Sequence, residues 1–125
     1  MAFQTLATYY FDKKFKKLTK KDGLLKERVI RTLQEISINP EIGKPKRHAL
    51  RGLRSVHLDP FVIIYAIIKD SILLINFDEH DKAYDTTPQI LDTLLGDSRT
   101  IEALENAGIT PEEYARFMRS LGKRK

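Results

Sequence analysis

The chain has 125 residues, of which 42% are hydrophobic, and carries a formal net charge of +5 with a pI near 9.5. This length predicts a single domain with one modest core. The absence of cysteine excludes disulfides and thiolate metal sites, and no apolar stretch approaches the roughly 20 residues of a membrane-spanning helix. We therefore expect a soluble, cytoplasmic protein whose N-terminus lacks the pattern of a signal peptide.

The charge is distributed unevenly along the chain. Residues 1–57 contain 14 Lys and Arg against 5 Asp and Glu, a net of +9, whereas residues 58–125 contain 8 against 12, a net of −4. A basic half indicates either a polyanion-binding face or pairing with the acidic half. Basic surface alone does not require a nucleic-acid partner, because many lysines are simply solvated.

The first 40 residues predict a strand followed by two helices. Aromatic and β-branched residues alternate over 3–9, which is typical of a strand. Residues 11–18 then place apolar side chains at helical spacing opposite a lysine-rich face. Thr19 followed by Asp22 resembles a capping box at the start of a second helix, and the proline at position 40 ends that helix near residue 38.

The middle of the chain predicts a sheet. Three strands are expected at residues 49–57, 61–68 and 72–77, after a basic loop over 41–47. Short links between consecutive strands predict an antiparallel meander, and the run over 61–68 is apolar on both faces, as in the centre of a sheet covered by helices. The expected fold class is α+β, with the order β-α-α-β-β-β and an antiparallel sheet packed against the N-terminal helical hairpin.

Residues 87–125 are predicted to form a helical C-terminal extension to a first unit of residues 1–86. Short helices are expected over 88–95 and 98–107. A third starts at Thr110, where an N-cap threonine precedes a proline and a glutamate follows three residues after the cap. The apolar face of this last helix requires burial on the preceding helix, on the sheet or on a partner.

All three histidines flank the predicted strands. His48 begins one strand and His57 ends it, while His80 follows the strand two further on, so His57 and His80 can share one edge of a meander. Imidazoles that titrate near neutral pH, beside fixed cations, suit phosphate-ester chemistry. The nearby cations are Lys44, Lys46, Arg47, Arg51 and Arg54.

Spacing alone leaves a structural role open, because a histidine at a strand end is more often a hydrogen-bonded surface residue than a catalyst. A metal site built from the three histidines and Asp81 is not favoured, since no two of the histidines have the close spacing of zinc motifs. We expect neither a metal nor a cofactor.

A family resemblance adds to this interpretation. After the strand, the helical hairpin and the basic loop come the segments L-R-G-L-R-S-V-H-L, I-I-Y and H-D-K-A-Y. This order resembles the RelE/ParE toxin superfamily of type II toxin–antitoxin systems, and within it the RelE/YafQ-type mRNA interferases, over about residues 3–85. His48, His57, His80 and Tyr84 match the three histidines and the aromatic residue of the YafQ-like members.

The resemblance implies a toxin that cleaves mRNA, often in the ribosomal A site, and that a cognate antitoxin holds inactive. The substrate's own 2′-OH attacks the adjacent phosphate without a metal. His57 or His80 is then the general base and the other the general acid, while His48 and Arg54 steady the phosphate and Tyr84 stacks on a base or orients His80. Negative charge stabilises a protonated imidazole, so the acidic residues around His80 favour it as the acid; these are Asp78, Glu79, Asp81 and Asp85.

Two alternatives stay open. A ParE-like or catalytically inactive member would act by binding a protein such as gyrase, and a small basic RNA-binding protein would need neither the histidines nor an antitoxin. The lack of an aromatic-rich exposed strand counts against the last of these. The extension departs from the family pattern, and we expect residues 111–121 to dock on the first unit, where they extend its core or partly cover its groove.

Overall fold

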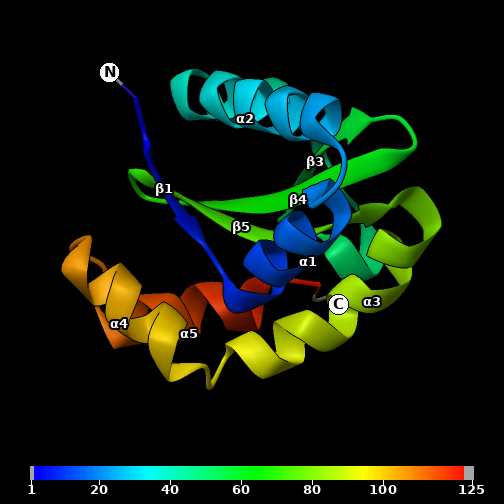
Figure 1. The fold of residues 1–125 in the computed structure, drawn as a ribbon. Coiled ribbons are helices and arrows are strands. Elements are labelled where there is room, and N and C mark those ends of the chain that lie inside the picture. Colours follow the sequence, from blue (N-terminus) through cyan, green and yellow to red (C-terminus); the bar gives the residue numbers. More distant parts are fainter. Residues whose placement is uncertain (1, 123–125) are drawn as a thin grey trace.

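The structure is a computed structural model, and it describes residues 2–122 (Figure 1). The last three residues of the expected extension, 123–125, lie outside the described part. The helices and strands, in chain order, are β1 (Gln4–Ala7), α1 (Tyr9–Thr19), α2 (Gly23–Ile38), β2 (Lys44–Pro45), β3 (Arg54–Leu58), β4 (Phe61–Ile68), β5 (Ser71–Glu79), α3 (His80–Leu94), α4 (Ser98–Asn106) and α5 (Pro111–Ser120), with 3-10 turns η1 (Pro40–Ile42) and η2 (His48–Leu50).

The α+β class and the predicted element order are confirmed. The strands form one sheet in the order β1-β5-β4-β3-β2. The three central strands are the expected antiparallel meander, but the whole sheet is mixed, because β1 pairs in parallel with β5, from Gln4 opposite Ser71 to Ala7 opposite Leu74. A short strand within the expected basic loop, β2, adds the other edge.

Helices cover both faces of the sheet. The hairpin of α1 and α2 packs its buried face, including Phe11 and Val29, on strand residues such as Ile63 and Phe77. Helices α3, α4 and α5 lie below the sheet in Figure 1, and they form the second apolar cluster with the opposite strand face. The strand β4 is buried along most of its length because it lies between these two layers.

The extension shares a core with the first unit. Leu94, Leu104 and Tyr114 are buried to 1% exposure or less in the same cluster as the β4 side chains, and the Tyr114 hydroxyl donates to the carbonyl of Leu94. Helix α3 also runs across the expected boundary between residues 86 and 87. The described residues therefore pack the extension against the sheet as a third layer.

Two predicted caps have different outcomes. The α2 helix is capped by Asp22, whose carboxylate accepts from the Leu25 N–H at 3.0 Å, so the prediction of Thr19 as the cap was wrong. The Thr19 hydroxyl instead donates to Phe15 O within α1. The capping box at Thr110 is confirmed, since its hydroxyl accepts from the Glu113 N–H at 3.1 Å and its own N–H donates to the Glu113 carboxylate at 2.9 Å.

Two element predictions near the candidate site were also wrong. The expected strand over 49–57 is extended only in β3, because η2 and the left-handed backbone of His48 (φ 57°) and Gly52 (φ 95°) fold its first half into a compact turn. The helix expected to start at Pro88 begins eight residues earlier, with Pro88 inside it. Among the described residues, no helix is long and apolar enough to cross a membrane.

Candidate active site

The position of helix α3 is fixed by one buried amide in the sheet. Asn76 is fully buried on β5, and its side-chain NH₂ donates to the hydroxyls of Thr86 and Thr87 at 3.0 and 3.1 Å. The same amide lies 3.4 Å from the carbonyl of Ala83. A buried amide is stabilised only when such partners are present, so these contacts hold the first turns of α3 against the sheet.

This placement brings three predicted residues together. His57 extends from the exposed end of β3, and its ring stacks on that of His80, the first residue of α3, with centroids 5.3 Å apart and planes 23° apart. The edge of Tyr84, one helical turn along α3, meets the His80 ring at 4.5 Å between centroids. The two predicted acid–base groups and the aromatic therefore form one continuous cluster.

The hydroxyl of Tyr84 connects this cluster to the basic loop. The Lys46 ammonium donates to it at 3.0 Å and also lies 4.7 Å from the centroid of the Tyr84 ring. The buried Ser55 hydroxyl shares a second hydrogen bond with the Tyr84 hydroxyl, at 3.3 Å. Ser55 was not predicted, although its place two residues before His57 on a strand puts both side chains on one face.

Of the acidic residues near His80, Asp81 contacts its ring and Asp78 does not. Asp81 lies 3.0 Å from Nδ1 of His80 but is 96% exposed, so the contact orients the ring and contributes little stability. Asp78 is buried and is engaged elsewhere, by Lys14 at 2.6 Å and by the Glu79 N–H at 2.8 Å. The predicted acidic cluster is therefore not a single patch around the imidazole.

His48 lies beside the cluster and does not stack in it. It is exposed on η2 and lines an open groove that runs up to Tyr84. The groove has an apolar wall and a basic rim, and its residues are Pro45, Lys46, Arg47, His48, Leu50 and Tyr84. Two of the predicted cations, Lys46 and Arg47, line this groove, and His48 lies on a turn and not at the start of a strand.

Arg54 does not join the histidines. Its guanidinium donates to the carbonyls of Gly43 at 2.7 Å and Glu41 at 3.3 Å. Arg54 is separated from His57 by three positions on β3, so the two side chains point to opposite faces of the sheet. The structure therefore gives Arg54 a role in holding the loop that follows α2.

Tyr65, the tyrosine of the I-I-Y segment in β4, is also a structural residue. Tyr65 is fully buried. Its hydroxyl donates to the carbonyl of Pro40 at 2.6 Å and accepts from the Gly43 N–H at 2.9 Å. Burial raises the pKa of Tyr65 above its usual value, while the Gly43 hydrogen bond and the charge of Arg54 oppose that rise.

The other predicted cations lie around the groove. Arg47 lines it, and Lys44 pairs with Ser55 across β2 and β3, which directs it to the same face of the sheet as Tyr84. Arg51 is exposed on the turn after η2, and its carbonyl accepts from Gly122 N–H. No three His, Asp or Glu side chains in residues 2–122 come together as metal ligands.

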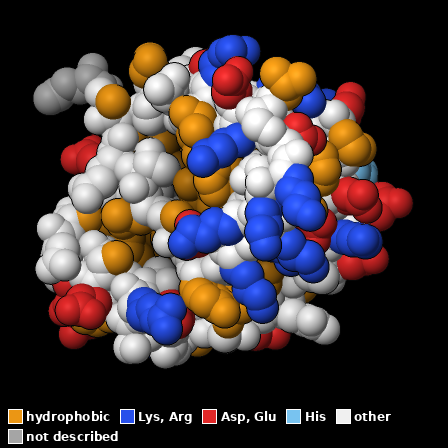
Figure 2. All heavy atoms as spheres, in the orientation of Figure 1, with side chains coloured by type: hydrophobic (Ala, Val, Ile, Leu, Met, Phe, Trp, Pro, Cys, Tyr) orange, Lys and Arg blue, Asp and Glu red, His pale blue; other side chains and the backbone are white. Residues whose placement is uncertain are grey.

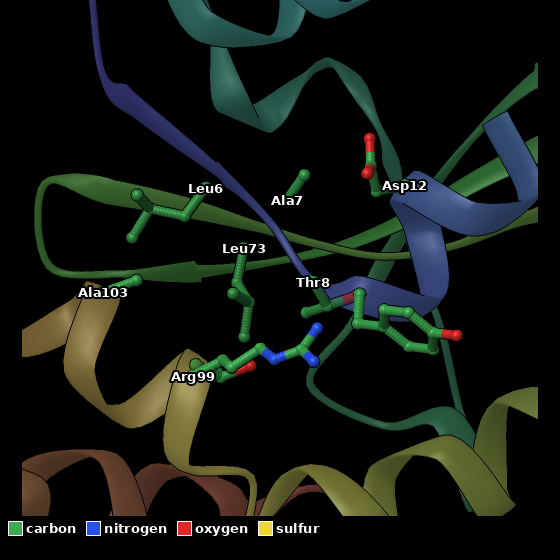
Figure 3. A pocket seen from close by; sticks show the side chains of 9 residues that line it. Leu6, Ala7, Thr8, Asp12, Leu73, Arg99 and Ala103 are labelled. Carbon is green, nitrogen blue, oxygen red and sulfur yellow. The ribbon is translucent and has the colours of Figure 1, made fainter. Parts of the chain in front are cut away.

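A separate cavity of about 220 Å³ lies far along the sheet from these residues (Figure 3). It is bounded by β1, the start of α1 and α4, and none of the predicted site residues lines it. Figure 3 shows Arg99 reaching from α4 toward Thr8, and its guanidinium lies 5.3 Å from the Tyr9 ring centroid. Figure 2 shows Lys and Arg side chains gathered over the region of α1.

Comparison with known proteins bears on this arrangement. A model of the ParE toxin of the type II toxin–antitoxin system parDE matches residues 8–84. The chain belongs to this toxin family. The match contains every predicted site residue from Lys44 to Tyr84 and stops before the second half of α3.

Two archaeal proteins are similar to the chain in sequence. The chain is 32% identical over 76 residues to a protein of Methanocaldococcus jannaschii named "Putative toxin RelE4", covering 58% of this chain and 81% of that one. It is 36% identical over 76 residues to a protein of Methanosarcina mazei, covering 58% and 88%.

Solved structures of toxins share the fold. The toxin–antitoxin complex RelBE2 of Mycobacterium tuberculosis superposes with a TM-score of 0.55 at 18% identity, covering 64% of this chain and all of that one. A mutant of the toxin RelE of E. coli in the free state gives 0.57 at 16% identity, covering 71% and 97%. Both cover about two thirds of the present chain, so the RelE-like fold accounts for the sheet and the helical hairpin.

Proposed function

We propose that this ParE-family toxin is an endoribonuclease that cleaves mRNA through His57 and His80. The observation that carries the proposal is the stacked pair of imidazoles 5.3 Å apart, joined to Tyr84 and Lys46 at the end of a basic groove. Two rings at this separation can contact the same phosphodiester, which is the arrangement that acid–base cleavage of RNA requires.

The proposed reaction uses the 2′-OH of the substrate as the nucleophile. His57 accepts the proton of the ribose 2′-OH, whose oxygen attacks the adjacent phosphorus, and the bond from phosphorus to the 5′-oxygen breaks. His80 gives a proton to that 5′-oxygen, so the products are a 2′,3′-cyclic phosphate and a 5′-OH. The contact between Asp81 and Nδ1 of His80 leaves Nε2 to face the leaving group, which favours His80 as the acid.

Lys46 and Tyr84 support the transition state. The Lys46 ammonium is held in place by the Tyr84 hydroxyl, so its charge is already oriented when negative charge develops on the phosphorane oxygens. Tyr84 orients His80 through their edge-to-face contact. Arg47 and His48, on the rim of the groove, contact the RNA backbone on one side of the scissile bond.

The partners follow from the same proposal. The substrate is mRNA in the cytoplasm, free or on the ribosome, and a cognate antitoxin neutralises the toxin. The antitoxin is supported by the RelBE2 structure, which contains a toxin of this fold in complex with its antitoxin.

A second candidate is favoured by the family match itself. The matching model describes ParE, and a ParE-like toxin would act by binding a protein such as gyrase without any RNA chemistry. The histidine stack supports the nuclease over this alternative, because binding alone gives no reason to place two imidazoles in contact beside a lysine and a tyrosine.

The test uses the purified chain and a 5′-labelled single-stranded RNA in the presence of EDTA. The proposal predicts fragments that end in a 2′,3′-cyclic phosphate, and no cleavage at a position where a single 2′-deoxy nucleotide replaces the ribose. Cleavage that leaves a 5′-phosphate, or that continues at the 2′-deoxy position, would contradict the mechanism.

A further inference from the structure

The end of the C-terminal extension lies directly against the loop that carries His48. After α5 ends at Ser120, the Gly122 N–H donates to the Arg51 carbonyl at 2.9 Å. Leu121 is buried in the same cluster as Leu50, at the end of η2, and Leu53, which precedes β3. Residues 120–122 lie outside the range that matches the toxin family.

Two glycines make this contact possible. Gly52 has φ +95°, and a Cβ atom there would lie 2.5 Å from Cδ2 of Leu121. Gly122 has φ +69°, and a Cβ atom there would lie 2.7 Å from the carbonyl oxygen of Ala49. Each segment therefore presents a residue without a side chain at the point where the other approaches, and each adopts a left-handed backbone that glycine tolerates best.

The loop needs such support. His48 is a non-glycine residue with φ 57°, a conformation that few residues adopt without help from their surroundings. The turn is closed by short-range hydrogen bonds, from Leu50 N to Arg47 O at 3.1 Å and from Arg51 N to His48 O at 3.0 Å. This turn sets where Arg47 and His48 stand on the rim of the groove beside Tyr84.

We propose that Leu121 and Gly122 are positioning residues that hold the loop of residues 47–52 in its RNA-binding shape. The end of the extension thus supports the groove from behind its loop, because neither Leu121 nor Gly122 lines the groove itself. This inference rests on the proposed function for its RNA component. Its structural component, the ordering of the loop by Leu121, does not depend on any activity.

The first experiment measures the order of the loop in the full chain. Native trypsin digestion followed by mass spectrometry gives the cleavage rate after Arg47 and Arg51, with cleavage after Lys21 in the α1–α2 turn as the internal reference. We expect Leu121→Ala to raise the rates after Arg47 and Arg51 at least tenfold while the Lys21 rate is unchanged, because local opening becomes easier where packing is lost. The volume-conserving Leu121→Met should behave like the wild type.

Unchanged rates after Arg47 and Arg51 would overturn the proposal. An equal rise at all three sites would also overturn it, because the loss of Leu121 would then act through global stability alone and not locally on this loop.

The second experiment measures RNA binding by fluorescence anisotropy of a labelled single-stranded RNA, with His57→Ala in every variant to prevent cleavage. Adding Leu121→Ala should raise the Kd about fivefold, and Leu121→Met should leave it unchanged. If His57→Ala and its combinations with Leu121→Ala and Leu121→Met all bind RNA with equal affinity, the link between Leu121 and the RNA-binding groove is refuted. If the His57→Ala chain does not bind RNA and the wild type does not cleave it, the proposed function fails. The trypsin result then decides separately whether Leu121 orders the loop.

Discussion

Removing helices α4 and α5 should prevent the rest of the chain from folding. A chain that ends at Leu95 lacks five buried apolar side chains of the shared core, namely Leu104, Ile109, Tyr114, Met118 and Leu121. At about 1.5–3 kcal/mol for each buried side chain, their burial contributes about 7–15 kcal/mol. This is an upper estimate, but it equals the roughly 5–15 kcal/mol by which a whole domain is stable.

The assay is urea denaturation of the full chain followed by circular dichroism, with a single substitution as the finer perturbation. Leu104→Ala, at a fully buried position, should lower the free energy of unfolding by about 2–5 kcal/mol. The matched control is Leu24→Ala, at a side chain that is 76% exposed on α2, and it should change this free energy by less than about 0.5 kcal/mol. Cooperative folding of the truncated chain with the midpoint of the full chain, or equal effects of the two substitutions, would refute a shared core and favour an independent unit of residues 1–86.

Three further predictions concern polar groups. Tyr84→Phe removes the hydroxyl that holds Lys46, so cleavage kinetics should show a roughly tenfold lower kcat/KM for RNA. Urea titration should show that the free energy of unfolding falls by only about 1 kcal/mol. Lys14→Met leaves the buried carboxylate of Asp78 without its cation and should cost about 1–3 kcal/mol of stability; adding Asp78→Asn should recover part of this loss in a double-mutant cycle. Burial raises the pKa of Tyr65 and Tyr114, so the folded chain holds these protons more tightly than the unfolded chain. The contribution of the two tyrosines to stability should therefore be constant below about pH 10 and fall above it, and urea midpoints above pH 10 should fall less steeply in Tyr65→Phe.

The parts of the fold that the sequence predicted are those with strong local signals. The β-branched run over 61–68 gave the bounds of β4 without error, and the threonine, proline and glutamate at 110–113 gave the start of α5. In both segments, the local preference and the tertiary packing favour the same conformation.

The errors near the site arise where a tertiary contact overrides the local pattern. Pro88 looks like a helix start, but the helix begins at His80 because Asn76 anchors its first turns to the sheet. The signal was present in the sequence, since an asparagine inside an apolar strand needs buried partners. The turn at His48 is also contacted by residue 122, whose N–H donates to the Arg51 carbonyl, and no local pattern could show that contact.

The residues of the candidate site and their geometry were each only partly predictable, since Arg54 points away from the histidines and Ser55 was missed. The stacking of His57 and His80 agrees with the expectation that both would lie on one edge of the meander. The direction of Arg54 depends on the register and face of β3, because a shift of one residue moves every side chain of a strand to the other face. The roles assigned to these residues stay predictions.

The central claim is that the histidine pair cleaves mRNA. The most direct measurement is mapping of cellular mRNA 5′ ends after induced expression of the wild type, His57→Ala and His80→Ala, with Gln89→Ala on the exposed face of α3 as the control. We expect growth arrest with discrete mRNA cuts for the wild type and the control, and a loss of roughly 10²–10⁴-fold in cleavage for each histidine variant. Growth arrest without cuts, or cuts that persist in both histidine variants, would contradict it.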